Sequence, residues 1–209
     1  MIKALTTTLA IGALSFTTAP NFDEHLDKWE VDYDHTRIEF SATHLMISEV
    51  EGVFENYTIE SKINKPSFED SQFKVNIQAA SINTGSKTRD KPLRSGDFLD
   101  IAEHPIISFE STTFKWAGEQ EFKMKGYFTI NGVRHLETFH VKYNGSVIDP
   151  ADNLEKAAFK ITGKINRYDY NLKWNITSDA AEAFSVGEEI ELECHLRLKR
   201  SANYANLTN

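Results

Sequence analysis

Apolar and polar residues alternate along most of the chain between positions 29 and 200. In residues 37–44, for example, Ile38, Phe40 and Ala42 alternate with charged and hydroxyl side chains. This period of two is typical of β-strands that bury one face. The pattern predicts strands within the ranges 37–45, 51–63, 73–82, 106–116, 121–130, 138–147, 157–165 and 189–199.

Short polar segments separate several of these ranges. Asn131-Gly132 predicts a two-residue hairpin turn, Ala117-Gly118 predicts a second turn, and residues 149–153 predict a longer loop. Parallel strands would need helical crossovers, and no connection in the pattern has that length. We therefore expect an all-β, antiparallel fold of about eight strands, which is either a sandwich or a closed barrel, and closure would remove the sheet edges.

One or two short helices are expected to cap these strands. The first would begin at Asp90, tolerate Pro92 in its first turn and end at Gly96. The second would begin at Ser178 or Asp179 and end before Gly187.

Length and charge narrow the choice of partners. The chain has 209 residues, a net charge of −8 and one cysteine, Cys194. This length suits one domain, and the acidic balance disfavours nucleic acid as a partner. A single cysteine excludes an internal disulfide, and its aliphatic neighbours on the strand face indicate a buried, unreactive thiol.

The N-terminus resembles a secretory signal peptide. A lysine at position 3 precedes an uncharged, mostly apolar stretch and then small residues, so residues 1–19 are expected to be removed, with cleavage near Ala19 or nearer Ala13. The protein would then be periplasmic or secreted. We expect no integral membrane segment in the mature chain and a flexible tail over residues 201–209.

The sequence offers no catalytic motif. It contains no G-x-S-x-G elbow and no glycine-rich phosphate loop, so we predict no catalytic residues. His135 and His140 lie five positions apart and would point to opposite faces of a strand, and the other histidines show no ligand spacing. We therefore predict no metal and no cofactor.

Five motifs together resemble the YceI-like family of bacterial, lipocalin-like, polyisoprenoid-binding proteins. These motifs are WEVDYDHTRIEFSATHL, VEGVF, AASINTGSKTRDKPLRSGDFLDIAEHPIISFEST, GYFTINGV and INRYDYNL. The resemblance implies a family domain over residues 27–200, an extended lipocalin-like barrel, and a tunnel that binds a polyisoprenoid or another long-chain amphiphile, such as a quinone-like lipid. A homodimer is among the assemblies that the sequence allows.

The apolar face of the predicted strands supplies the candidate tunnel wall. Its members are Ile38, Phe40, Phe54, Ile59, Phe73, Val75, Ile77, Phe109, Met124, Phe128, Phe139, Val141, Phe159 and Ile161. The alternative is that these side chains fill a solid core, as in many small barrels.

Charged residues form a dense cluster in residues 86–105, which we call the charged segment. We expect Arg89, Asp90, Arg94, Asp97 and Asp100 to form a salt-bridged cap over the barrel mouth. The arginines could also meet a polar lipid head group, since a guanidinium fork suits phosphate or quinone oxygens. Further head-group candidates are His44, Arg167 and Asp169, the last two expected on one strand face.

Three hypotheses follow from these observations. The first is a non-catalytic protein that binds, transports or stores an isoprenoid lipid. The second is an enzyme that acts on such a lipid through the Arg/Asp/His set, and the third is an interaction module whose barrel is filled.

Overall fold

The computed structural model describes residues 29–63, 65–173 and 186–200. Within these ranges it contains β1 (Trp29–Val31), η2 (Tyr33–His35), β2 (Arg37–His44), β3 (Ser48–Phe54), β4 (Tyr57–Lys62), β5 (Gln72–Gln78), η3 (Ala79–Ser81), β6 (Ile82–Asn83), α1 (Lys87–Arg94), β7 (Ile106–Gly118), β8 (Glu121–Ile130), β9 (Val133–Ile148), β10 (Glu155–Asn166), η4 (Arg167–Tyr170) and β11 (Val186–Arg200). The predicted signal peptide, the second predicted helix up to Ser185 and the predicted flexible tail lie outside the described residues.

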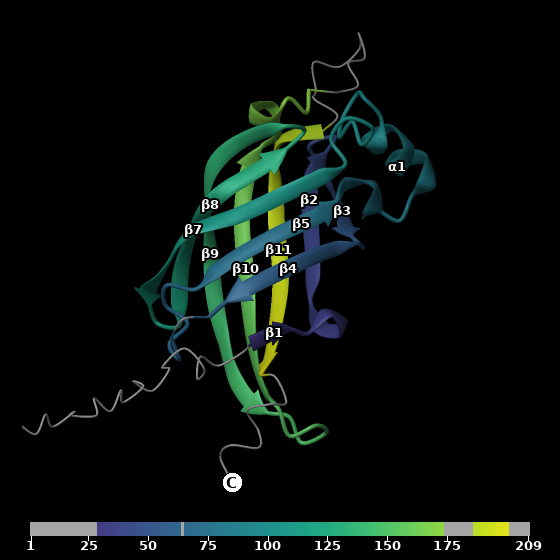
Figure 1. Ribbon diagram of the computed structural model, residues 1–209. Helices are drawn as coiled ribbons and strands as arrows, with labels where there is room; N and C mark the ends of the chain where they lie inside the picture. Colours follow the sequence, from purple (N-terminus) through teal and green to yellow (C-terminus); the bar gives the residue numbers. More distant parts are fainter. Residues whose placement is uncertain (1–28, 64, 174–185, 201–209) are drawn as a thin grey trace, which may run out of the picture.

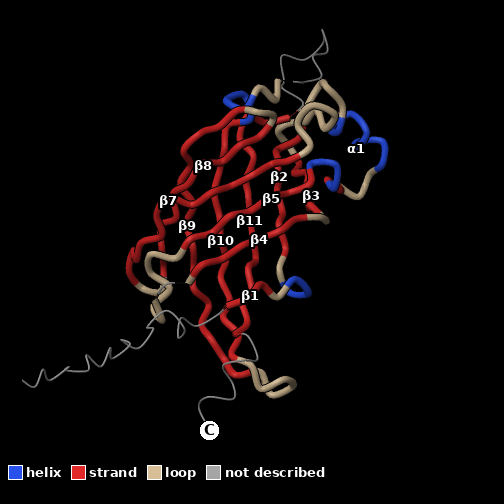
Figure 2. Tube along the Cα trace, viewed as in Figure 1, coloured by secondary structure: helices blue, strands red, loops and turns tan. Residues whose placement is uncertain are grey.

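The strands form one strongly curled antiparallel sheet (Figure 1, Figure 2). Hydrogen-bonded neighbours follow the order β4-β5-β7-β8-β9-β10-β11-β2-β3-β6, and β1 adds to β11. The described residues therefore hold eleven strands, more than the eight or so expected. The lipocalin-like, all-β fold class is confirmed.

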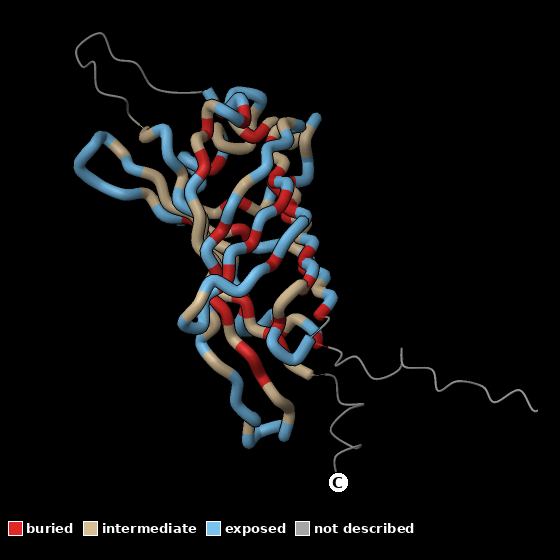
Figure 3. The backbone as a smooth tube through the Cα atoms, turned by 90° about the vertical axis from the view of Figure 1, so that its left-hand side faces the viewer, coloured by how far each residue is buried: buried red, intermediate tan, exposed pale blue. Residues whose placement is uncertain are grey.

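Burial alternates along these strands as the sequence pattern predicts. In β8, buried Phe122, Met124 and Phe128 alternate with exposed lysines and tyrosine. Figure 3 shows the same alternation of buried and exposed positions along the tube. The sheet thus encloses its apolar face and presents its polar face to solvent.

The two edges of the curled sheet meet at the connection between β3 and β4. These strands are consecutive in the chain yet lie near opposite ends of the sheet order. Tyrosine side chains bridge this seam: the Tyr57 hydroxyl donates to the Thr36 carbonyl at 2.6 Å, and the Ile59 N–H donates to the Tyr33 hydroxyl at 3.0 Å. The molecule is a curled half-barrel whose seam is joined by side chains.

The predicted strand over residues 51–63 is wrong, because it is two strands with a corner between them. At that corner the Glu55 N–H donates to the Ser81 carbonyl, and the Asn56 carbonyl accepts from the Gln78 N–H. Phe54 and Ile59 both line the cavity although five positions separate them, so the alternation shifts phase at the corner. This shift was the available sequence signal, and the prediction of one continuous strand overlooked it.

The hairpin turns agree with the sequence in one case and differ in another. Asn131 and Gly132 occupy the left-handed region with φ of 50° and 73°, which confirms the predicted turn. The turn predicted at Ala117-Gly118 lies instead at Glu119-Gln120, with φ of 45° and 66°. Strand β7 reaches Gly118 because a register shift after Trp116 accommodates the extra residue.

A three-residue loop, residues 45–47, joins β2 to β3 and was not predicted. Leu45 and Met46 lie in the left-handed region, with φ of 52° and 60°, between the last residue of β2 and Ile47. Leucine and methionine are not typical turn residues, so no local pattern predicted this loop.

Helix α1 begins earlier than predicted. Ser86 is its N-cap and Ser95 its C-cap, so Asp90 and Pro92 lie inside the helix. Pro92 lacks the N–H that would bond one turn back, and the helix ends two residues later, at Arg94. Among the described segments, no helix is long and apolar enough to cross a membrane.

An ion cluster on the outer surface links two separate parts of the chain. The Asp70 carboxylate accepts from Lys65 Nζ at 2.6 Å and from Lys115 Nζ at 2.5 Å. The hydrogen bonds from Lys115 and Lys65 lower the pKa of Asp70 to about 2. This ion cluster fastens the loop before β5 to the outer face of β7.

Candidate functional site: an apolar cavity with one polar end

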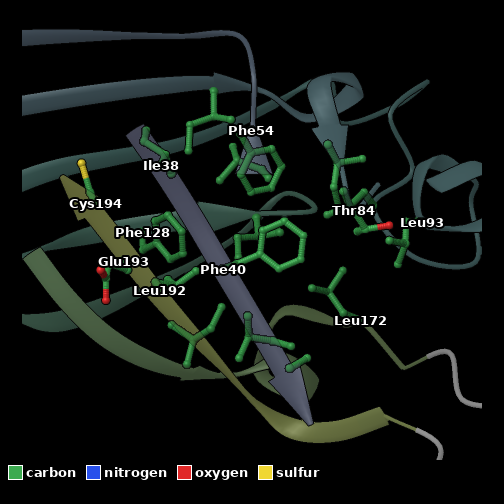
Figure 4. Close-up of a pocket in the computed structure, with 18 of the residues that line it drawn as sticks. Ile38, Phe40, Phe54, Thr84, Leu93, Phe128, Leu172, Leu192, Glu193 and Cys194 are labelled. Atoms are coloured by element: carbon green, nitrogen blue, oxygen red, sulfur yellow. The ribbon is translucent and has the colours of Figure 1, made fainter. Parts of the chain in front are cut away.

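The sheet encloses a cavity of about 520 Å³ (Figure 4). This volume lies within the range of small-molecule binding sites, which is about 300–1,000 Å³. Along β2 the lining extends from Ile38 to His44, and six steps of about 3.3 Å each give a length of roughly 20 Å. The barrel interior is therefore hollow in this region rather than packed solid.

The structure brings nearly all predicted wall residues to this cavity. They are Ile38, Phe40, Phe54, Ile59, Phe73, Val75, Ile77, Phe109, Met124, Phe128, Phe139 and Ile161. Figure 4 shows the rings of Phe40, Phe54 and Phe128 among the lining side chains. Whether these residues touch a ligand stays a prediction.

Val141 and Phe159 differ from this set and lie outside the cavity lining. Both are buried, but they point into a region that is packed shut. The ring of Phe68 lies 5.0 Å from that of Phe159 and 5.3 Å from that of Trp29, and Tyr143 packs against Phe68 and Phe159. One edge-to-face pair and several tilted pairs thus fill the interior beside Phe159 with aromatic rings.

Three pairs of glycine and phenylalanine shape the inner wall. Phe40 lies over Gly52, so closely that a Cβ on that glycine would overlap its ring. The other two pairs are Phe109 over Gly126 and Phe139 over Gly163, in which a Cβ would lie 2.5 Å from a ring carbon. All three phenylalanines line the cavity. The missing side chains let the rings lie against the sheet, which leaves the centre of the barrel open.

The polar lining residues gather at one end of the cavity, apart from Glu193 on β11. They come from the end of β2 and from the segment that enters and forms α1, and they are Thr43, His44, Thr84, Ser86, Thr88 and Arg89. Figure 1 shows α1 at this end of the sheet. The cavity is thus apolar along its length and polar at its mouth, which we call the α1 end.

The sequence pattern missed several apolar residues of the α1 end. Leu93, Phe98 and Leu99 line the cavity from within the charged segment, and Leu172 lines it just after η4. Their positions follow no strand period. The only available signal was the presence of large apolar residues among charges near a helix.

Thr84, two residues before the charged segment, is the shared hydrogen-bond partner of Arg89 and Asp90. The buried Asp90 carboxylate accepts from the Thr84 N–H at 3.0 Å and from the Thr84 hydroxyl at 2.6 Å. Arg89 donates to the hydroxyl and the carbonyl of the same threonine at 2.8 and 2.7 Å. These bonds fasten α1 to the residue that follows β6.

Of the salt-bridged network predicted for the segment, the described residues show one ion pair, between Arg94 and Asp90 at 3.9 Å. Arg94 also donates to the carbonyls of Ala80 and Ile82. Asp97 is exposed, and Asp100 adopts a left-handed turn conformation with φ of 45°. Backbone carbonyls, which a sequence pattern does not reveal, are the main partners of Arg94.

Arg167 and Asp169 do not share a strand face, contrary to the prediction. The chain leaves β10 and forms the 3₁₀-helix η4 at these positions. Arg167 is fully buried and donates to the carbonyls of Leu172 and Gly187, whereas Asp169 is exposed. Arg167 joins η4 to the start of β11 and does not line the cavity.

Asn171 ends η4 in the left-handed conformation with φ of 59°. Asparagine is the residue that best replaces glycine there, because its short polar side chain tolerates this region. Next to it, the buried Tyr170 hydroxyl donates to Glu137 Oε1 at 2.7 Å. Burial and this carboxylate together raise the pKa of Tyr170 above its usual value.

Cys194 faces the cavity from β11 and is half-buried. Burial, together with the negative charges of Glu39 and Glu193, raises the pKa of its thiol to about 12. The thiol is therefore protonated at neutral pH and is a poor nucleophile.

Glu39, Glu193 and His195 form a cluster on β2 and β11 whose potential ligand atoms lie within 4.8 Å of one another. The search for ligand spacing along the sequence missed this cluster, because its residues come from two strands. His195 Nε2 lies 2.7 Å from Glu193 Oε1, and Lys160 Nζ lies 2.8 Å from the same oxygen. A lysine that shares this carboxylate oxygen would compete with a cation, so we interpret the cluster as ion pairing between strands.

Comparison with known proteins identifies relatives across the whole described barrel. The model of the YceI-like domain matches residues 29–198. UPF0312 protein SA2479 of Staphylococcus aureus (strain N315) is 32% identical over 162 residues, which cover 78% of this chain and 91% of that protein.

Solved structures share the fold. A Campylobacter jejuni YceI protein is 25% identical with a TM-score of 0.64, and the match covers 76% of this chain and 90% of that one. A polyisoprenoid binding domain from Saccharophagus degradans is 11% identical with a TM-score of 0.58, over 84% of this chain and 100% of that domain. The extent of the domain match and the identity to the staphylococcal relative, together with this barrel and its apolar cavity, show that the chain belongs to the YceI-like family.

Proposed function

We propose that this protein binds a polyisoprenoid or a similar long-chain amphiphile without chemically changing it, and so carries or stores the lipid. The observation that carries this proposal is the apolar cavity with polar side chains gathered at its α1 end. An amphiphile has the same division, with a long apolar tail and one polar head. The polyisoprenoid binding domain from Saccharophagus degradans, which shares the fold, supports this class of ligand.

The apolar wall supplies enough free energy for binding without any catalytic group. Burial of a tail gains about 0.8 kcal/mol per CH₂, so a ten-carbon stretch gains roughly 8 kcal/mol before the costs of association. The Cys194 thiol that faces the cavity is protonated, and Arg89 and Asp90 bond to Thr84. These features favour a binding site over an enzyme that uses the charged segment.

Lipid extraction followed by mass spectrometry tests the proposal. We expect native mass spectra of protein purified without detergent to show a discrete adduct, and organic extraction to release an isoprenoid lipid. A clean apo mass that stays unchanged after incubation with quinones and polyprenyl lipids would contradict the proposal and favour a filled interaction module. Chemical conversion of an added isoprenoid would favour the enzyme.

Two neighbouring positions on β2 provide matched variants. Ala42 lines the cavity, and Ser41 lies on the other face of the same strand. Ala42→Trp places an indole in the lumen and should abolish the adduct, whereas Ser41→Trp should retain it. Equal loss in both variants would indicate damage to the strand rather than occlusion of the cavity.

We also propose that the protein works outside the cytoplasm, in the periplasm or the medium. The apolar stretch in residues 1–19 with its single preceding lysine supports export. N-terminal sequencing of protein recovered from fractionated cells tests this point. A full-length N-terminus on protein from the cytoplasmic fraction would refute it.

A further inference from the structure

The hairpin turn between β2 and β3 exposes three consecutive apolar side chains. Leu45 is 49% exposed, Met46 is 74% exposed and Ile47 is 88% exposed. We call these residues the apolar tip. Large apolar side chains gain nothing by contact with water, so an exposed run of three calls for an explanation.

The backbone of the apolar tip is poorly suited to its side chains. Leu45 and Met46 both have positive φ, which is costly for residues with a Cβ and favours asparagine and glycine. Where two consecutive positive-φ residues join β8 to β9, the same chain uses Asn131-Gly132, in a loop one residue shorter. The tip therefore keeps bulky apolar side chains in a conformation that Asn-Gly would adopt more easily.

The apolar tip lies next to the mouth of the cavity. Thr43 and His44, which precede it, and Val50, which follows it, all line the cavity. Within the turn, the His44 carbonyl accepts from the Ile47 N–H at 3.3 Å and from the Ser48 hydroxyl at 3.1 Å. Satisfying this carbonyl lowers the cost of moving the turn out of water.

We propose that the apolar tip inserts into the surface of an electrically neutral lipid bilayer and so brings the α1 end of the cavity against the membrane. The tip is a convex hairpin of three side chains, far smaller than the roughly 800 Å² per partner of a standard protein interface. A bilayer needs no complementary shape and accepts isolated apolar anchors. The net charge of −8 disfavours anionic lipids, so insertion would be driven by apolar contact.

Flotation with vesicles of phosphatidylcholine and phosphatidylethanolamine tests this inference directly. Leu45→Asn with Met46→Gly places residues that tolerate positive φ at both strained positions, so this double variant should keep its thermal stability or gain some. We expect its partition into vesicles to fall at least tenfold. Binding of the natural chain should persist when the salt concentration is raised, because no charge pairing is required.

A second double variant controls for general loss of apolar surface. Val147 and Ile148, each 62% exposed, lie at the far end of β9, away from the α1 end (Figure 1). Val147→Ser with Ile148→Ser should leave vesicle binding unchanged. Equal loss in both double variants, loss of binding at high salt, or no vesicle binding by the natural chain would overturn the inference.

A second copy of the chain is the alternative partner for the apolar tip. A concentration-dependent dimer in sedimentation experiments that disappears in the Leu45→Asn, Met46→Gly variant would assign the tip to a second copy of the chain and overturn the bilayer assignment. Binding of the apolar tip to a bilayer does not depend on the proposed function. The use of that binding in lipid uptake does rest on it. If no lipid is ever extracted but vesicle binding depends on the tip, the carrier function fails while the membrane contact stands.

Discussion

Replacement of Asp90 by alanine separates the structural role of the charged segment from a role in head-group binding. The Asp90 carboxylate accepts two hydrogen bonds from Thr84, and both residues are buried. The alanine variant leaves the N–H and the hydroxyl of Thr84 without this acceptor. If Asp90 only fastens α1 to Thr84, a role that we call the structural latch, the main effect should be a loss of stability.

The expected loss follows from the two bonds. Hydrogen bonds to a charged group contribute about 1.5–3 kcal/mol each, so Asp90→Ala should cost about 4 kcal/mol. The partly exposed contact with Arg94, at 3.9 Å, adds little. For a domain of this size the melting temperature should fall by about 8–16 °C.

Urea unfolding of the purified protein measures this effect. With a slope m of about 2 kcal/mol per molar, the midpoint should fall by about 2 M. Asp97→Ala is the matched control, because Asp97 belongs to the same segment but is exposed, and its midpoint should stay unchanged. An Asp90→Ala protein with normal stability and no bound lipid would refute the latch and assign this carboxylate to the ligand.

Three further perturbations test the wall, the outer surface and the thiol. Gly52→Ala should push the Phe40 ring into the lumen and reduce the lipid recovered by extraction. Gly96→Ala is the control and should not reduce it, because the new Cβ would meet nothing closer than 3.8 Å. Equal recovery from both variants would contradict the role of Gly52 in shaping the wall. Because ion pairing lowers the pKa of Asp70 to about 2 from an unfolded value of about 3.9, its contribution to stability is present above pH 4 or so and is lost as pH falls toward about 2. The difference in urea midpoint between the natural chain and Asp70→Asn should therefore close in that window, and a difference that persists at pH 2 would be inconsistent with the ion pairs. Cys194, with a pKa of about 12, should resist alkylation at pH 8 in the folded protein and react readily in urea; fast reaction of the folded protein would show that its thiol is not shielded.

The period of two predicted the strands, and with them most of the cavity wall, because burial on one sheet face depends only on local alternation. The predictions failed where geometry depends on distant partners. The corner at Glu55-Asn56 is held by backbone bonds to Ser81 and Gln78, and no local composition reports such contacts. The Leu45-Met46 turn was missed for the opposite reason, since its residues contradict the local preference for turns.

The charged segment illustrates a second limit of sequence reasoning. Charge alone predicted salt bridges, yet Arg94 bonds to two carbonyls and Asp90 bonds to Thr84. Every residue carries a carbonyl, so this acceptor leaves no trace in composition. The residue types therefore predicted that the segment is polar but not how it is fastened.

The pairing of β2 with β11 has a consequence for the order of folding. The Arg197 N–H donates to the Thr36 hydroxyl, and 161 positions separate the two residues in the chain. A chain emerging from the ribosome can form the β7-β8-β9-β10 meander and the β2-β3 pair from neighbouring segments, but the other edge of β2 must wait for β11. Contacts of such long sequence separation fold slowly, over milliseconds to seconds, and leave an unpaired strand edge exposed meanwhile. The lumen thus comes into existence only when synthesis is nearly complete.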